Sequence, residues 1–246
     1  MKYVILIHSN PQPWGHPAAA VLDTCHLMFT TAHTVSTGAS VHDPGLAREA
    51  IRLTRVLYRA VPDHDEVAGA LALMLLTHAR TEARTDTRGE LVPLAEQDRS
   101  RWDGDAIAEG AGILERVLPR GHIGRYQLEA AIAAVHAEAL TWESTDWRQI
   151  AVLYAMLDRA APSPAVTLNR AVAMVAGPEA GLRLTEPLLG EPAMRRHHRL
   201  YAVRGHLLEM AGDAAARMSY RRAAALTASL PEQRYLNARL RRLESS

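Results

Sequence analysis

The 246-residue sequence contains one cysteine, one lysine and only 5% aromatic residues. A single cysteine, Cys25, excludes a disulfide framework and a thiolate metal cage, and it suits a reducing compartment. Long hydrophobic runs are also missing: the longest, such as residues 67–76, have about half the length that a membrane helix needs. Residues 1–8 are more typical of a short strand than of a signal peptide. We therefore expect a cytoplasmic protein that makes no contact with a membrane.

Charge is nearly balanced overall, with a formal net charge of +1, but it is unevenly distributed. Residues 195–246 have a net charge of +7, and residues 1–194 have a net charge of −6. A basic end of this kind can attract nucleic acid or an acidic protein surface. The alternative is that these arginines lie on solvent-exposed helix faces and bind no partner. Residues 234–242 would then form a polar helix that caps the end of the stack.

Hydrophobic residues make up 48% of the chain, and they recur at helical spacing almost throughout. Residues 66–79 are apolar on nearly all sides, which indicates a buried helix. The sequence therefore predicts an all-α protein. The expected helices cover residues 18–31, 46–57, 66–79, 105–118, 125–139, 146–160, 164–176, 179–189, 195–211, 213–228 and 231–243.

Short connections containing glycine or proline join most of these helices, which favours antiparallel hairpins. The hairpin from Tyr201 to Pro231 fits a tetratricopeptide pattern, because Gly205 is small where helices would cross and Gly212-Asp213 forms a turn. We expect stacked hairpins resembling an α-solenoid in residues 146–246, continuous with a helical domain at 18–145. Residues 1–17 would form a strand-like stub.

A long polar loop at about residues 81–105 interrupts the helical pattern and contains most of the candidate site. Asp98 could accept a guanidinium group, and Trp102 offers a face on which an arginine can stack. The cluster could bind an acidic or planar ligand, or a carboxylate of a partner chain. The alternative is a structural clamp that pins the long loop to the helices. The candidate residues are His78, Arg80, Arg84, Gln97, Asp98, Arg99, Trp102, Asp103 and His136.

Motifs for catalysis, cofactors and metals are missing from the sequence. It has no phosphate-binding glycine loop, nucleophile elbow or paired-carboxylate motif, so we expect no cofactor and no catalytic residue. Two of the five early histidines, His26 and His33, are seven residues apart, whereas helical metal ligands pair at three or four. No metal site is expected. The early histidines are His8, His16, His26, His33 and His42.

From about Val21 to Arg242 the chain resembles a known family through six stretches: LALMLLTHAR (71–80), LVPLAEQDRSRWD (91–103), IAEG (107–110), YQLEAAIAAVHAEA (126–139), TDW (145–147) and PSPAVTLNRAVA (162–173). The family is the C-terminal helical extension of extracytoplasmic-function RNA polymerase sigma factors. The sigma-factor regions that read promoter DNA would precede this extension, and they are not in this sequence. Residues 1–11 (MKYVILIHSNP) resemble the opening strand of a YCII-related (DGPF) protein.

The resemblance implies a non-catalytic regulatory module that acts in transcription initiation. Its partner would be RNA polymerase or sigma-factor machinery, held on the concave side of the stacked hairpins, without direct DNA binding. The alternative is a small-ligand sensor or enzyme with a polar pocket around His78, Arg80, Asp98, Arg99, Trp102 and His136. A homo-oligomeric scaffold is a third interpretation.

Overall fold

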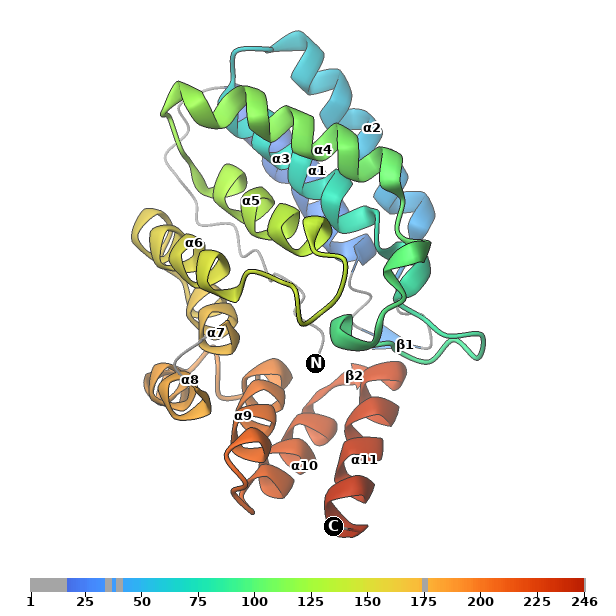
Figure 1. The fold of residues 1–246 in the computed structure, drawn as a ribbon, viewed down its shortest axis with the longest axis vertical. Helices are drawn as coiled ribbons and strands as arrows, with labels where there is room; N and C mark the ends of the chain where they lie inside the picture. Colours follow the sequence, from blue (N-terminus) through green and yellow to red (C-terminus); the bar gives the residue numbers. More distant parts are fainter. Residues whose placement is uncertain (1–16, 34–36, 39–41, 174–176, 246) are drawn as a thin grey trace.

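The computed structural model describes residues 17–33, 37–38, 42–173 and 177–245, and the described part is all-α (Figure 1), as the sequence predicts. The expected strand at the N-terminus lies outside the described residues, apart from Pro17, which begins α1. The helices are α1 (Pro17–His33), α2 (Pro44–Ala60), α3 (Asp65–His78), α4 (Gly104–Val117), α5 (Arg125–Glu138), α6 (Trp147–Ala160), α7 (Pro164–Val172), α8 (Pro178–Thr185), α9 (His198–Met210), α10 (Ala216–Leu226) and α11 (Leu230–Ser245).

Several helices begin at side chains that accept hydrogen bonds from the first turn. The carboxylates of Asp43, Asp103 and Asp146 cap α2, α4 and α6, and the Ser163 hydroxyl caps α7. Such caps stabilise a helix by about 1 kcal/mol each, because they satisfy backbone N–H groups that have no partner inside the helix.

Four expected helices are shorter in the structure by several residues, and one of them, expected at 164–176, ends at Val172. The helix expected at 179–189 stops at Thr185 and is followed by a 3-10 turn, Pro187–Leu189, because proline has no N–H with which to continue the ladder. The helix expected at 195–211 begins only at His198. The helix expected at 213–228 is shortened to Ala216–Leu226, and residues 228–229 form a short strand instead.

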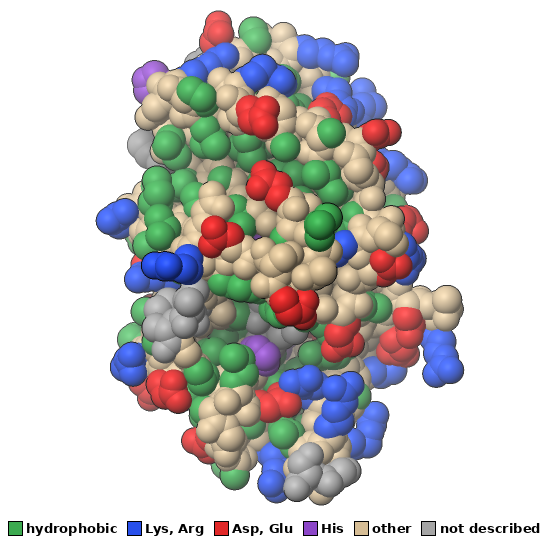
Figure 2. Space-filling model, in the orientation of Figure 1, with side chains coloured by type: hydrophobic (Ala, Val, Ile, Leu, Met, Phe, Trp, Pro, Cys, Tyr) green, Lys and Arg blue, Asp and Glu red, His purple; other side chains and the backbone are tan. Residues whose placement is uncertain are grey.

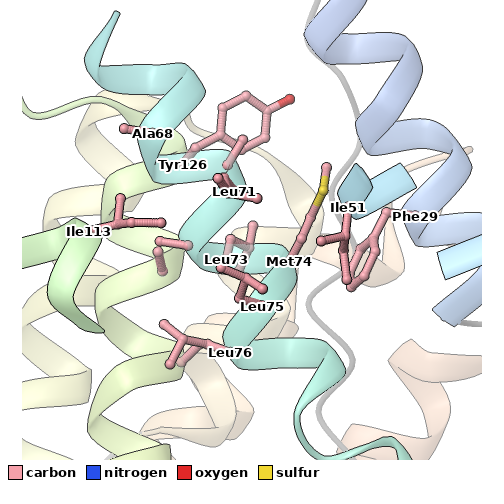
Figure 3. Packing of buried hydrophobic residues seen from close by; sticks show 14 of the residues in the cluster. Phe29, Ile51, Ala68, Leu71, Leu73, Met74, Leu75, Leu76, Ile113 and Tyr126 are labelled. Atoms are coloured by element: carbon pink, nitrogen blue, oxygen red, sulfur yellow. The ribbon is translucent and has the colours of Figure 1, made fainter. Parts of the chain in front are cut away.

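The largest hydrophobic core surrounds α3. Every residue from 67 to 76 is buried, because α1 and α2 pack on one side of this helix and α4 and α5 on the other. Figure 3 shows Met74 directed toward Ile51 and Phe29, and Ile113 on the opposite side of α3. A helix covered on all sides needs apolar residues all round, which is the pattern that the sequence has there.

Three further cores follow in chain order. Each is formed by neighbouring helices: the first joins α5, α6 and α7, the second joins α7 and α9, and the third joins α9, α10 and α11. Consecutive helices pack against each other from α5 to α11 (Figure 1). This serial arrangement buries apolar faces that no single hairpin could cover alone.

The C-terminal helices contact the N-terminal half of the chain at two places. Strand β2 (Ala228–Ser229) pairs in parallel with β1 (Thr37–Gly38), in the connection between α1 and α2. Arg234 on α11 forms an ion pair of 2.8 Å with Glu90 in the long loop. The C-terminal helices are therefore tied to the N-terminal half of the chain at both places, which the sequence did not predict.

None of the helices in the described ranges is both long enough and apolar enough to cross a lipid bilayer.

Candidate functional site

Seven of the nine candidate residues lie on a long connection between α3 and α4 whose two ends are joined, whereas His78 ends α3 and His136 lies in α5. The Asp103 backbone N–H donates to the Ala79 carbonyl at 2.9 Å. Between them the chain forms three 3-10 turns, at Thr81–Ala83, Leu94–Glu96 and Arg99–Arg101. Its tip is held by Asp86, whose carboxylate accepts the backbone N–H groups of Arg88 and Glu90 at 2.8 Å each. The polar sequence thus forms an ordered loop built from its own hydrogen bonds.

Three of the candidate residues stabilise this loop and its junction with α4. Asp98 is exposed and accepts hydrogen bonds from the backbone and hydroxyl of Ser100, at 3.0 and 2.6 Å. These bonds lower the pKa of its carboxyl. Asp103 caps α4, and the Gln97 side-chain amide donates to the Val92 carbonyl at 3.1 Å. In the part of the chain that the structure describes, Asp98 forms no ion pair with an arginine, and the expectation that it holds a guanidinium group stays a prediction.

Arg99 connects the loop to the end of α5. Its Nη1 donates to the carbonyls of His136 and Ala139, at 2.5 and 2.6 Å, and its Nη2 to the Thr145 hydroxyl at 3.3 Å. These carbonyls lie in the last turn of α5 and just beyond it, where the helix itself supplies no donor. The guanidinium also stacks over the Trp102 ring, 4.8 Å from its centroid, as the sequence predicted. Arg99 therefore acts as a clamp that holds the loop against the end of α5.

Arg80 and Arg84 differ from Arg99, because no carboxylate forms an ion pair with either of them in the part of the chain that the structure describes. Arg84 is only 1% exposed, and its Nη1 lies 2.7 and 2.6 Å from the two ring nitrogens of His33. Arg80 lies over Trp102 at 5.9 Å. Burial, and then the charge of Arg99, lowers the pKa of Arg80 to about 10.

Burial lowers the pKa of both candidate histidines. His78 is half-buried, and its Nδ1 lies 3.2 Å from the Thr81 hydroxyl. Burial lowers its pKa. Burial, assisted by the charges of Arg80 and Arg99, lowers the pKa of His136 to about 3. A base with so low a pKa is a weak proton acceptor near neutrality, which makes His136 a poor general base.

Helices α9 and α11 contribute residues near this loop that the sequence does not reveal. The charges of Arg199 and Glu232 act on Arg84, although both are more than a hundred positions away. Glu232 accepts a hydrogen bond of 2.8 Å from Thr227 and lies 2.9 Å from His198 and 3.8 Å from Arg199. No sequence pattern could have linked these residues to the loop.

The early histidines do not form a metal site where they can be described. His8 and His16 lie outside the described residues, and His26 and His33 are buried in α1. Among the described side chains, no group of three histidine, cysteine, aspartate or glutamate residues could hold a metal ion.

A surface pocket of about 660 Å³ lies away from the loop, at the turn between α2 and α3. Two of its three acidic side chains, Asp65 and Glu66, are already engaged. Asp65 pairs with Arg120 at 2.9 Å, and Glu66 accepts backbone N–H groups of Tyr126 and Gln127 at the start of α5. These contacts tie α3 to α5, which gives the carboxylates a structural role.

Comparison with known proteins gives a family match without an activity. Residues 18–118 match a family of unknown function, DUF6596. A protein of Rhizobium meliloti (strain 1021), named "Uncharacterized protein R00370", is 41% identical over 225 residues, which cover 90% of this chain. The chain spans 53% of that relative's length. No solved structure matches the chain.

Proposed function

We propose that the chain is a non-catalytic regulatory module, related to the C-terminal helical extension of extracytoplasmic-function sigma factors. It would act in transcription initiation by binding RNA polymerase or a sigma factor. The observation that carries the non-catalytic part is the use of the polar loop: Asp98 and Asp103 cap turns, and Arg99 binds carbonyls of α5. These contacts hold turns and helices together, which is a structural use of the polar side chains in the loop.

The link to transcription is supported by the sequence stretches that resemble the sigma-factor extension, above all residues 71–80, 91–103 and 126–139. These stretches contain the central helix α3, the loop and α5, which pack together around Trp102 and the main core. The length of the Rhizobium meliloti relative also supports the proposal, because a protein of that size has room for further regions beside one like this chain.

The basic surface of α9–α11 is the proposed contact area. Figure 2 shows arginine side chains spread over the end of the molecule where Figure 1 places these helices. Arg217, Arg221 and Arg222 are exposed on α10. Such a surface favours an acidic patch on a protein partner and would speed association at low salt. Direct DNA binding would need aromatic residues between the arginines, and few are present there.

A binding assay with purified components tests this proposal. The full chain is titrated against purified bacterial RNA polymerase core, alone and with an extracytoplasmic-function sigma factor. We expect saturable binding that Arg217→Glu combined with Arg221→Glu weakens roughly tenfold, or about 1.4 kcal/mol. The matched control, Arg59→Glu with Arg148→Glu, reverses two exposed arginines elsewhere and should bind normally. No binding to either preparation would overturn the proposal.

Two further parts of the proposal concern location and assembly. We place the protein in the cytoplasm, where its partner is found, and we expect no retention on promoter DNA. DNA retention that falls steeply with salt would contradict this, because such a slope reports released counterions. A mass that rises with protein concentration would instead favour the oligomeric scaffold.

The small-ligand alternative has less support in the form that the sequence suggested. Two of its six residues already have structural contacts: Asp98 accepts hydrogen bonds from Ser100, and Arg99 donates to carbonyls at the end of α5. Arg80 and Arg84 remain without an acidic partner among the described residues.

A further inference from the structure

Arg84 is a buried cation whose donors are only partly used. Its Nη1 contacts His33, whereas its Nε and Nη2 are buried and have no hydrogen-bond partner among the residues that the structure describes. An unpaired charge in a protein interior costs several kcal/mol, because it has lost its hydration. Donors left in this state therefore require an explanation.

The neighbours of Arg84 increase this positive charge. Arg80 lies one helical turn earlier in the chain, and the charges of Arg80 and Arg199 both lower the pKa of Arg84. Glu232 is the acid that opposes them, and it already binds Thr227, His198 and Arg199. Glu82 lies between the two arginines in sequence and is exposed. Among the charged groups that act on Arg84, two positive charges thus oppose one negative charge.

A further unused donor lies beside Arg80. The Trp102 ring contacts the Arg80 guanidinium, and the Nε1 of this tryptophan is buried without a partner in the described part of the chain. An indole N–H can only donate, and so can a guanidinium. The unused groups of Arg84 and Trp102 therefore all need an acceptor rather than a second donor. Arg80 is the less enclosed of the two arginines, since it is partly exposed whereas Arg84 is 1% exposed.

We propose that Arg80 and Arg84 form an oxyanion site that binds a phosphate group. The Nε and Nη2 of Arg84 form the side of the guanidinium that takes two oxygens at once, and Arg80 supplies the second positive charge. A phosphate dianion offers more than two oxygens and a charge that matches two arginines, whereas a carboxylate offers two oxygens and one negative charge. This site goes beyond the proposed binding of polymerase and does not depend on it.

Thermal unfolding and titration calorimetry with inorganic phosphate test the site on the full chain, without any partner protein. At phosphate concentrations a hundred times Kd, we expect Tm to rise by roughly 5 °C or more, because the ligand binds only the folded state. Acetate and chloride at equal ionic strength are the comparison anions, and they should give a much smaller rise.

Two variants assign the effect to these arginines. Arg84→Met and Arg80→Met should each reduce the phosphate-dependent rise in Tm by more than half. Arg88→Met, which removes an exposed arginine at the tip of the same loop, should leave it unchanged. If Arg84→Met does not fold, the result with Arg80→Met decides whether the site exists, because Arg80 is less buried than Arg84. The proposal is overturned if phosphate gives no rise, if acetate or chloride gives an equal one, or if the rise survives in the variants that fold.

Discussion

At the scale of single residues, the role of a polar side chain is set by the groups around it. Asp98 and Arg99 are adjacent in sequence, yet Asp98 caps a surface turn while Arg99 holds the end of α5. Their positions in the sequence make both residues candidates for one ligand site. Buried donors without partners, as on Arg84 and Trp102, distinguish a candidate site from a clamp better than the density of polar residues does.

Arg99→Met should destabilise the protein by about 2–3 kcal/mol, because it removes charge-assisted hydrogen bonds to the carbonyls of His136 and Ala139. Chemical denaturation at neutral pH measures this change. Arg101→Met is the control, since Arg101 is exposed in the same 3-10 turn, and it should change the free energy of unfolding by less than about 0.5 kcal/mol. Equal effects of the two variants would show that Arg99 is no clamp.

Glu129 should make stability depend on pH. Its carboxyl is 1% exposed, and burial raises its pKa from 4.5 to about 7 against the opposing influence of Arg125. A folded-state pKa above the unfolded value means that the folded protein binds the extra proton. Its contribution is therefore most favourable below pH 4.5 and is lost as pH rises through 7, for a total of roughly 3 kcal/mol.

Glu129→Gln tests this dependence, because glutamine keeps the shape and removes the titration. The free energy of unfolding of the wild type, minus that of the variant, should fall between pH 4.5 and 7.5. Taking the difference cancels buried histidines such as His26, whose lowered pKa acts in the opposite direction over much of this range. A difference that is flat with pH would contradict the assignment.

At the scale of elements, close helix contacts in the C-terminal half depend on small residues. A Cβ atom at Gly205 on α9 would lie 2.8 Å from the Tyr220 ring on α10. Tyr220 cannot easily move, because its hydroxyl donates to Glu209 at 2.6 Å, and Glu209 also pairs with Arg239 on α11. This is the position at which the tetratricopeptide pattern predicts a small residue, and the repeat assignment itself stays a prediction.

Gly205→Ala should destabilise the protein by about 1–3 kcal/mol, because the added methyl group overpacks the contact between α9 and α10. Thermal unfolding monitored by circular dichroism measures the effect. The matched control is Gly112→Ala on α4, where the nearest atom, on Arg116, would lie 3.6 Å from the new Cβ. That change should stabilise by about 0.5–1 kcal/mol through helix propensity. If Gly205→Ala leaves the free energy of unfolding unchanged, α9 and α10 can move apart enough to accept the methyl group.

At the scale of the whole molecule, a series of local cores is joined by contacts between its distant parts. Each core from α5 onward is shared by helices that are close in sequence. The pairing of β1 with β2 and the ion pair of Glu90 with Arg234 then link α11 to the N-terminal half. These contacts bring Arg199 and Glu232 close enough to influence Arg84.

The Glu90–Arg234 pair should contribute little stability by itself, since both side chains are largely exposed. A double-mutant cycle with Glu90→Gln and Arg234→Gln should give a coupling energy of about 0.5 kcal/mol, falling at high salt. Urea unfolding of the four proteins at low and high salt supplies the numbers. A coupling energy well above 1 kcal/mol would mean that this contact, rather than the strand pairing, holds α11 in place.

The sequence by itself determined the helical class, most helix positions, the buried α3 and the long polar loop, because apolar spacing and capping residues act within a few positions of one another. It did not determine which polar residues share a site. Arg84 meets His33 across 51 positions and Arg99 meets Ala139 across 40, and the influence of Glu232 on Arg84 extends over still more of the chain. Only the tertiary structure decides such encounters, because hydrogen bonds and charges act through space between segments whose sequence separation leaves no periodic trace.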